Sequence, residues 1–343
     1  MTAESHTPTD GLVIVDKPAG LTSHDVVARI RRLAGTRRVG HAGTLDPMAT
    51  GVLVIGLGKA TRLLGHLTLS EKEYTGTIRL GQATDTDDAE GQVVSEASAG
   101  EVTDAAIASA AAALTGEIQQ VPPGFSAIKV GGKRAYRMAR AGAAPELAAR
   151  TVTVRELTIQ AVRRPASDTV GQAPAGAQAA GGQESAGREP AAQAPSGQQA
   201  VASDASGRDT AGAGLVDVDV AVTCSSGTYI RALARDLGAA LGVGGHLTAL
   251  RRTRVGPYTI AVARTLDQLA DSFEVIPLAD AAASAFRRRD LNEEEARRLA
   301  HGARLPLTEG GGGPVAAFAP DGSLIALLAD EGGEARPLAV FVP

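Results

Sequence analysis

The polar segment at residues 165–214 is the feature that most restricts how this chain can fold. It contains no aromatic residue, leucine or isoleucine, and it consists largely of Ala, Gly, Gln, Ser and Pro. Such a composition cannot bury enough apolar surface to offset the chain entropy that ordering removes. We therefore predict a disordered insertion, and the core must be built from the residues on either side.

Two alternating segments flank this insertion. Residues 151–162 alternate between apolar and polar side chains, and Val216, Val218, Val220 and Val222 alternate with polar residues after it. A period of two is typical of a half-buried strand. Because the entropy of loop closure grows only logarithmically with length, a long insertion between paired strands costs little. We predict a hairpin with the insertion at its tip.

Other segments predict helices and strands around this hairpin. The first helix, residues 24–34, is indicated by three signals. Its apolar residues have helical spacing, a Thr or Ser can act as the N-cap, and a glycine ends it. Predicted strands lie at residues 11–16 and 73–86, and predicted helices at residues 24–34, 103–115 and 229–241.

The C-terminal part has a different pattern. Asn292 and Glu295 have the spacing of a capping box at the start of a helix. A PDG turn at residues 320–322 between two apolar runs predicts a hairpin. We therefore expect a larger domain over residues 1–270, interrupted by the insertion, and a small β-rich domain over residues 274–343.

Composition excludes several protein classes. The only cysteine, Cys224, permits no intrachain disulfide and no thiolate metal site of its own. The N-terminus has no signal-peptide pattern, and no apolar run approaches the roughly 20 residues needed to span a bilayer. We predict a soluble, cytoplasmic protein with no membrane partner.

Basic residues are clustered although the net charge is −4. The overall charge argues mildly against bulk electrostatic binding of nucleic acid. Local basic clusters on a mildly acidic protein instead indicate that an anionic partner contacts a limited part of the surface. The clusters comprise Arg29, Arg31, Arg32, Arg37 and Arg38; Lys129, Lys133, Arg134, Arg137 and Arg140; and Arg251, Arg252 and Arg254.

A single carboxylate, Asp46, stands among the first of these clusters. No other Asp or Glu occurs between Asp25 and Glu71. Pro47 follows directly and disfavours helical geometry at Asp46, which would fix the direction of the carboxylate. The arrangement could offer one nucleophilic or acid/base group to a polyanion. An Asx turn or a helix N-cap is an equally open interpretation.

Several ordered motifs resemble one enzyme family. The blocks read KPAGLTS at residues 17–23, GHAGTLDP at 40–47, KEY at 72–74, LG at 80–81, TDT at 84–86, VPP at 121–123, SA-K at 126–129, SGTYIR at 226–231 and LRR at 250–252. Together they resemble the TruB family of tRNA pseudouridine-55 synthases, in its bacterial stand-alone form. The resemblance covers residues 11 to about 255, with the insertion as the main departure, and the C-terminal match is weak.

The resemblance implies a fold and a reaction. The fold is α+β, the pseudouridine synthase fold, with a mixed, largely antiparallel central sheet and a small C-terminal PUA-like domain. The reaction cleaves the N1–C1′ bond of uridine 55 in the tRNA T-loop, turns the uracil and rejoins it through C5. It implies no cofactor and no metal. Asp46 would be the nucleophile or general base, and its exact chemical step is left open.

The resemblance also assigns active-site roles, each with a structural alternative. Tyr74 would stack on the target base, or be a core aromatic residue of a strand. Arg231 would pair with the catalytic carboxylate, or lie on a helix surface, and Asp88 would complete the ionic network, or be a solvated turn residue. His41 would fill the space left by a flipped base, or be structural. Leu250 would line the uracil pocket, or be a core leucine.

Phosphate contacts are expected from the basic clusters. Such contacts position RNA without reading its sequence, although a run of charge is often only a solvated face. Lys17 is assigned either to RNA binding or, with Pro18, to support of the site. The expected RNA-binding residues are Lys17, Arg31, Arg32, Arg37, Arg38, Lys129, Lys133, Arg134, Arg251 and Arg252.

Competing functions remain open. An N-glycoside hydrolase would break the same kind of bond, although the usual mechanism needs two carboxylates, and Asp88 could supply the second. A non-catalytic RNA-binding or RNA-folding protein would need only the basic clusters. A guide-RNA-dependent relative of the same fold is a third alternative. We expect a monomer that acts on the tRNA T-stem-loop with no obligatory protein or guide-RNA partner.

Overall fold

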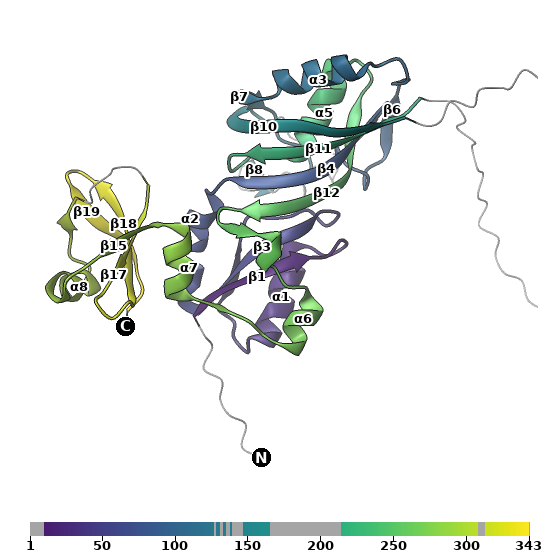
Figure 1. Ribbon diagram of the computed structural model, residues 1–343. Helices are drawn as coiled ribbons and strands as arrows, with labels where there is room; N and C mark the ends of the chain where they lie inside the picture. Colours follow the sequence, from purple (N-terminus) through teal and green to yellow (C-terminus); the bar gives the residue numbers. More distant parts are fainter. Residues whose placement is uncertain are drawn as a thin grey trace, which may run out of the picture.

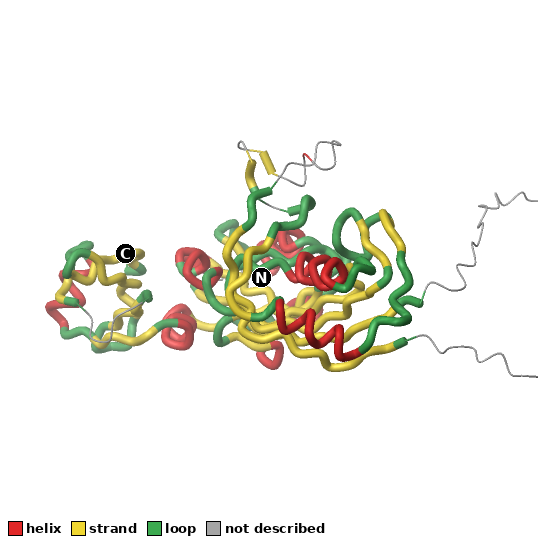
Figure 2. The backbone as a smooth tube through the Cα atoms, turned by 90° about the horizontal axis from the view of Figure 1, so that it is seen from above, coloured by secondary structure: helices red, strands yellow, loops and turns green. Residues whose placement is uncertain are grey.

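The computed structural model describes residues 10–126, 128–130, 133–134, 138, 147–164, 214–307 and 313–342 (Figure 1). These residues form a large ten-stranded sheet with helices, and a smaller five-stranded sheet near the C-terminus. Figure 2 shows the C-terminal unit lying beside the large sheet rather than over it. None of the helices in these described ranges is long and apolar enough to cross a membrane.

The large sheet is almost entirely antiparallel. Its strands run in the order β14-β1-β3-β12-β4-β11-β10-β7, with β2 on β3 and β13 on β12. The exception is the pairing of β12 with β3, which is parallel over two residue pairs. The predicted mixed, largely antiparallel sheet is confirmed. The strands are β1 (Gly11–Lys17), β2 (Val39–Ala42), β3 (Thr50–Leu57), β4 (Lys72–Leu80), β7 (Gly116–Gln120), β10 (Arg150–Arg163), β11 (Val216–Cys224), β12 (Gly245–Val255), β13 (Tyr258–Thr259) and β14 (Ile276–Pro277).

The predicted hairpin lies in the outer half of this sheet. Strands β10 and β11 pair antiparallel, from Val154 opposite Cys224 to Arg163 opposite Asp217. The alternating valines of β11 are all buried, as a half-buried strand requires. The pairing of the two strands is confirmed, whereas the predicted disorder of residues 165–214 concerns a segment that lies, apart from its last residue, outside the described residues.

Helices on both halves of the sheet surround its core. Helix α1 (Ser23–Leu33) and helix α6 (Leu266–Asp271) pack near β1, and α3 (Asp104–Ala113) and α5 (Ile230–Ala240) pack near β10 and β12 (Figure 1). One aliphatic cluster runs through both groups. Smaller elements are η1 (Gly58–Arg62), α2 (Leu64–Thr68), β5 (Gln82–Thr84), β6 (Val93–Glu96), β8 (Lys129–Val130), β9 (Lys133–Arg134) and η2 (Ile260–Val262).

The helix starts follow their capping residues. Thr22 accepts a hydrogen bond from the backbone N–H of Asp25 at the start of α1, and Asp25 completes a capping box. Thr103 caps α3. Asn292 and Glu295 form the predicted capping box of α8 (Glu293–Ala300). The cap of α8 was predicted, and that of α1 was expected at a Thr or Ser, because a cap depends only on local sequence.

The smaller sheet forms the C-terminal unit. Its order is β15-β17-β18-β19-β16, and α7 precedes it in the chain. Phe318 and Phe341 share an apolar cluster with Leu12 and Ile14 of β1, so the two units pack together through α7. The chain leaves the large sheet after β14 and enters the small sheet at β15. The bounds are α7 (Leu278–Ala285), β15 (Arg287–Asp290), β16 (Leu305–Pro306), β17 (Val315–Phe318), β18 (Leu324–Glu331) and β19 (Glu334–Val340).

Candidate active site

The loop that carries Asp46 connects β2 to β3, and hydrogen bonds to Ser23 and Gly20 hold it in place. Ser23 Oγ donates to the Leu45 carbonyl over 3.1 Å and accepts from the Leu45 N–H over 2.9 Å. The Gly20 N–H donates to the Pro47 carbonyl over 2.8 Å. The residues on both sides of Asp46 are therefore held by the start of α1 and the turn before it.

Lys17 supports the same loop from inside the protein. Its side chain is fully buried, and Nζ donates to the carbonyls of Pro18, Leu21 and Pro47 over 2.9, 2.7 and 3.2 Å. Burial lowers the pKa of the ammonium to about 8, against the opposing effect of Asp46. Lys17 is not available to a phosphate, which corrects the RNA-binding expectation and agrees with the alternative of a supporting role.

Arg252 is buried beneath the other end of the loop. It is 1% exposed, and its guanidinium donates to the carbonyls of Val52 over 2.7 Å and Gly43 over 3.1 Å. Arg252 is therefore not an exposed phosphate contact, since its donors are used by backbone inside the protein, although its side chain lines the cavity beside Asp46. Arg252 is buried because its strand, β12, lies between β3 and β4 in the middle of the sheet.

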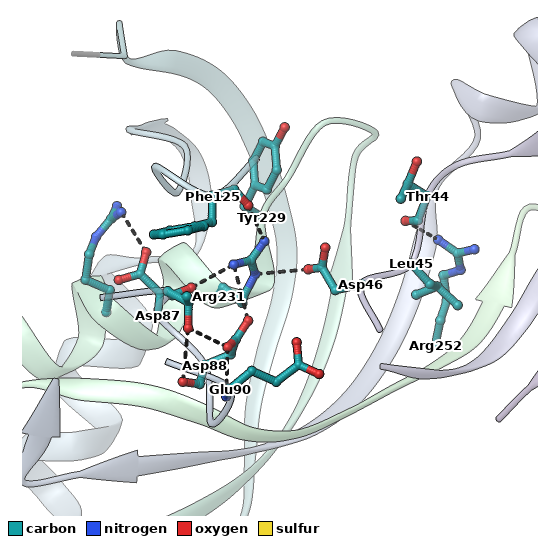
Figure 3. Close-up of polar contacts among 12 residues, drawn as sticks. Thr44, Leu45, Asp46, Asp87, Asp88, Glu90, Phe125, Tyr229, Arg231 and Arg252 are labelled. Carbon is teal, nitrogen blue, oxygen red and sulfur yellow. Dashed lines mark hydrogen bonds and ion pairs between the residues drawn. The ribbon is translucent and has the colours of Figure 1, made fainter. Parts of the chain in front are cut away.

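Arg231, at the start of α5, meets Asp46 as predicted (Figure 3). Its Nε lies 2.9 Å from Asp46 Oδ2, an ion-pair distance, although the N–H direction does not make a regular hydrogen bond. Its other nitrogens donate to the carbonyls of Thr86 over 2.7 Å and Phe125 over 2.9 Å. The guanidinium is therefore held in place by backbone and directed at the carboxylate.

Asp88 completes the ionic network, as predicted. Its Oδ2 lies 3.2 Å from Arg231 Nη1, and its Oδ1 accepts from Thr86 Oγ1 over 2.6 Å and from the Glu90 N–H over 3.1 Å. The residue is only 3% exposed. The alternative of a solvated turn carboxylate is excluded by this burial.

A cavity of about 300 Å³ opens beside the Asp46 carboxylate. Tyr74 from β4 and Leu250 from β12 line it, and each is 8% exposed. Burial is the main cause that raises the pKa of the Tyr74 phenol. The Asp46 side chain is 36% exposed, so it can reach a ligand in the cavity. The cavity is lined by Gly43, Thr44, Leu45, Asp46, Thr68, Lys72, Tyr74, Ser126, Gly227, Thr228, Tyr229, Ile230, Arg231, Leu250 and Arg252.

His41 lies on β2 and is not among the residues that line the cavity. Its ring packs edge-on against His24 of α1, with 5.5 Å between ring centroids. Burial, reinforced by His24 and Arg252, lowers the pKa of His41. The imidazole is therefore neutral at neutral pH. It lies where β2 contacts α1, and we call this place the His41 rim.

The predicted RNA-binding residues fall into different environments. Arg31, Arg32, Arg37 and Arg38 are exposed on α1 and the following turn, and Arg31 also donates to the Val39 carbonyl over 3.1 Å. In contrast, Arg251 is half-buried in the sheet. It lies 2.7 Å from Asp16 Oδ2 and donates to Thr50 Oγ1 over 3.3 Å. Lys129, Lys133 and Arg134 belong to the β8–β9 hairpin, and their side chains are outside the described part of the chain.

Tyr229 and Lys72 are among the residues of the cavity wall that the sequence interpretation did not assign to the site. Tyr229 is the N-cap residue of α5, and burial raises the pKa of its phenol. Lys72 is 6% exposed and donates to the carbonyls of Thr68 and Ser70, and burial lowers its pKa to about 8. Both belong to motif blocks that carried the family resemblance, so the signal was present in the sequence.

The site therefore combines one accessible carboxylate with a fixed guanidinium, an aromatic ring and an aliphatic wall. Tyr74, Leu250 and Asp46 line the same cavity, so a planar base bound there can contact all three. In the described ranges, from residue 10 to 342 with their gaps, no group of three or more His, Cys, Asp or Glu residues could hold a metal ion.

Solved structures that share this fold are complexes containing Cbf5. The chain is similar to the "Cbf5-Nop10-Gar1 Complex", with a TM-score of 0.63 and 26% identity, covering 97% of this chain and 85% of that one. It is also similar to the archaeal "box H/ACA sRNP Nop10-Cbf5 complex", with a TM-score of 0.62 and 25% identity, covering 100% of this chain and 89% of that one. The chain has the fold of pseudouridine synthases, which are isomerases.

Sequence comparison identifies the family. The chain is 57% identical to the tRNA pseudouridine synthase B of Thermobifida fusca, over 97% of this chain and 98% of that protein. It is 53% identical to the protein of the same name from Streptomyces coelicolor, over 98% and 99% of the two chains. Residues 31–176 match the TruB family pseudouridylate synthase N-terminal domain, and residues 286–342 match the C-terminal domain of tRNA pseudouridine synthase II. The chain belongs to the TruB family of pseudouridylate synthases.

Proposed function

We propose that this enzyme converts uridine 55 in the T-loop of tRNA to pseudouridine. The observation that carries the proposal is the ion pair between Asp46 and Arg231 at a cavity walled by Tyr74 and Leu250. Its relatives are named tRNA pseudouridine synthase B, which supports tRNA as the substrate. The position within tRNA rests on the resemblance of the motif blocks.

The chemistry requires the target base to leave its stack. Flipping a nucleotide costs a few kcal/mol, and insertion of the uracil against Tyr74 offsets part of that cost. Asp46 then acts as nucleophile or general base while the N1–C1′ bond breaks. The uracil turns within the cavity, a C5–C1′ bond forms, and the proton lost from C5 is replaced by one gained at N1, so no atom is added or removed.

The environment of Asp88 favours isomerisation over hydrolysis. A glycosidase mechanism needs a second carboxylate that can reach the substrate or an attacking water. Asp88 is buried, its Oδ1 accepts from Thr86 and Glu90, and its Oδ2 forms an ion pair with Arg231. It therefore fits a role in orienting Arg231 and not that of the second carboxylate.

The exposed arginines of α1 and the turn after it are the proposed phosphate contacts. Arg32, Arg37 and Arg38 are exposed close to the His41 rim. We propose that they position the T-stem-loop and that the neutral ring of His41 occupies the space that the flipped uridine leaves. The hairpin that contains Lys129 would contact the RNA from the other side of the cavity.

The proposal extends to the assembly, partners and domains of the protein. We propose a cytoplasmic monomer that uses neither a guide RNA nor a protein partner, and that requires no cofactor or metal. The division into a catalytic domain over residues 1–270 and a PUA-like domain over residues 274–343 also remains a proposal.

Incubation of the protein with an unmodified tRNA transcript tests this function. We expect one pseudouridine in the T-loop by chemical labelling and no free uracil, and Asp46→Asn should still bind tRNA but form no product. Free uracil would indicate a hydrolase. Pseudouridine at another position would refute the substrate assignment, and full function of Asp46→Asn would indicate a non-catalytic RNA-binding protein.

A further inference from the structure

Gln120 is a buried polar residue at the end of an otherwise exposed edge strand. Strand β7 leaves its first three residues largely at the surface, whereas Gln120 is 1% exposed. Burial of a primary amide is unfavourable unless its donors and acceptor are satisfied. The partners of this amide therefore indicate why the chain places it there.

Both partners of Gln120 are backbone groups of one residue, Tyr229. The Tyr229 N–H donates to Gln120 Oε1 over 2.8 Å, and Gln120 Nε2 donates to the Tyr229 carbonyl over 3.1 Å. Tyr229 is the N-cap residue of α5, and its own side chain makes no capping hydrogen bond. The amide of Gln120 therefore fixes the backbone at the point where α5 begins, from a residue 109 positions earlier in the chain.

The start of α5 is also where the active site is built. Tyr229 and Arg231 both line the cavity beside Asp46, whereas Gln120 is not among the lining residues. Arg231 donates to the Phe125 carbonyl, which belongs to the loop that Gln120 begins (Figure 3). The loop and the helix are thus tied together at three places, by Gln120, by Arg235, which donates to the Val121 carbonyl, and by Arg231.

We propose that Gln120 is a positioning residue that sets the direction of Tyr229 and Arg231 toward Asp46. This inference rests on the proposed function and adds a residue that acts without touching the substrate. The active-site geometry depends on a donor and an acceptor presented side by side, and an amide supplies both. A displacement of about 1 Å at a reacting group can cost about 100-fold in rate.

A Gln120→Glu substitution tests the donor specifically. An ionised carboxylate cannot donate to the Tyr229 carbonyl, whereas a protonated carboxyl has the same shape as the amide with one donor and one acceptor. Burial raises the pKa of a carboxyl group, so the variant should recover as the pH falls. Two cations are near this position: Arg150, which is opposite Gln120 on β10, and Arg235, which donates to the Val121 carbonyl. Their positive charge favours the ionised carboxylate, so it lowers the pH at which the variant recovers but does not change the direction of the pH dependence. The Tyr229 phenol stays neutral because burial raises its pKa.

Gln119→Glu is the matched control. Gln119 is the preceding residue of the same strand, is exposed, and donates to Thr151 Oγ1 over 2.8 Å. The substitution introduces the same charge one residue away from Gln120. We would measure kcat and KM for tRNA from pH 5.5 to pH 8.5 in the wild type and both variants, with thermal unfolding of each.

The expected result is a loss of kcat at pH 8 for Gln120→Glu of about 10- to 100-fold with a nearly unchanged KM. The ratio of its kcat to that of the wild type should rise as the pH falls, while the ratio for Gln119→Glu stays flat. A wild-type kcat at every pH, or a loss that no pH reverses, would overturn the positioning role. An inactive wild type would instead refute the proposed function, so the two failures are distinguishable.

Discussion

The buried and the exposed cations of this enzyme do different work. Lys17, Arg231 and Arg252 are buried and direct their donors at backbone carbonyls or at Asp46. Arg32 and Arg37, on α1 and the turn after it, are exposed to solvent. The comparison teaches that the basic residues of this chain form two populations, a buried one that supports the Asp46 site and one that is exposed to solvent.

The difference has an energetic basis. A buried cation is tolerated only when its donors are satisfied, and loss of one partner leaves the others desolvated and unpaired. An exposed cation interacts weakly with its own protein but strongly with a phosphate chain, and that attraction is screened by salt. Substitutions in the buried set should therefore affect turnover or stability, and those in the exposed set should affect RNA affinity.

The largest expected effect follows from Arg231→Lys. A lysine cannot contact Asp46, Asp88 and the backbone carbonyl of Thr86 together, because it lacks the planar fork of the guanidinium. We expect kcat to fall by about 10²–10³-fold with tRNA affinity retained, the range for loss of one oriented electrostatic interaction. Single-turnover kinetics and a filter-binding assay would measure the two quantities.

Arg235→Lys is the control for that experiment. Arg235 lies one turn further along α5, where it is 3.2 Å from Asp87 Oδ2 and donates to the Val121 carbonyl over 2.8 Å. Its substitution should reduce kcat much less. Equal losses in the two variants would mean that the helix as a whole matters and that the interaction with Asp46 is not special.

Arg252→Met should separate the two populations by stability. The substitution leaves the carbonyls of Val52 and Gly43 buried without their donors. We expect the free energy of unfolding to fall by about 2–3 kcal/mol, measured by urea denaturation. Arg32→Met, an exposed counterpart, should change it by no more than about 0.5 kcal/mol. A stable Arg252→Met variant with weakened tRNA binding would contradict the division.

Substitution of the exposed arginines should act on the salt dependence of binding. Replacement of Arg32, Arg37 and Arg38 by Gln should weaken tRNA binding. It should also reduce the slope of log K against log salt by about 0.7–0.9 for each phosphate that is no longer neutralised. Fluorescence anisotropy at several salt concentrations gives this slope. An unchanged slope would show that these arginines are a solvated face.

The smallest effect concerns the pH dependence of stability through Lys17. Its pKa is about 8 in the folded protein, below the ordinary value of 10.5. Above pH 8 the unfolded chain binds more protons at this group than the folded chain does, so its contribution to stability rises with pH until about 10.5. Below pH 8 both states are protonated and the contribution is constant.

A comparison with Lys17→Met isolates that contribution. The free energy of unfolding of the wild type minus that of Lys17→Met should increase by about 1 kcal/mol between pH 8 and pH 9. Urea denaturation at each pH provides both values. A difference that is independent of pH would mean that Lys17 keeps its proton in the folded state.

Much of the local structure could be predicted from the sequence. The capping box of Asn292 and Glu295 was predicted, and the cap of the first helix was expected at a Thr or Ser, because a cap depends on residues three positions apart. The alternating valines of β11 identified a strand with one buried face. The Asp46–Arg231–Asp88 network was expected from the resemblance, and the structure brings the three residues together.

The errors share a physical cause. Lys17 and Arg252 are cations in basic motif blocks, which is why phosphate contacts were expected of them. The packing of β1 and β12 around the Asp46 loop buries both side chains. The role of Gln120 depends on hydrogen bonds to Tyr229, more than one hundred residues away in sequence. Neither burial nor a long-range hydrogen bond has a local pattern that sequence periodicity can reveal.

The sequence by itself determined the elements, the family and the isolated carboxylate at Asp46, because periodicity, caps and motif blocks are local properties of a chain. Only the tertiary structure decided which cations enter the site and which remain in solvent. That choice depends on where strands from distant segments meet, since burial turns the same guanidinium from a phosphate ligand into a support for the catalytic loop.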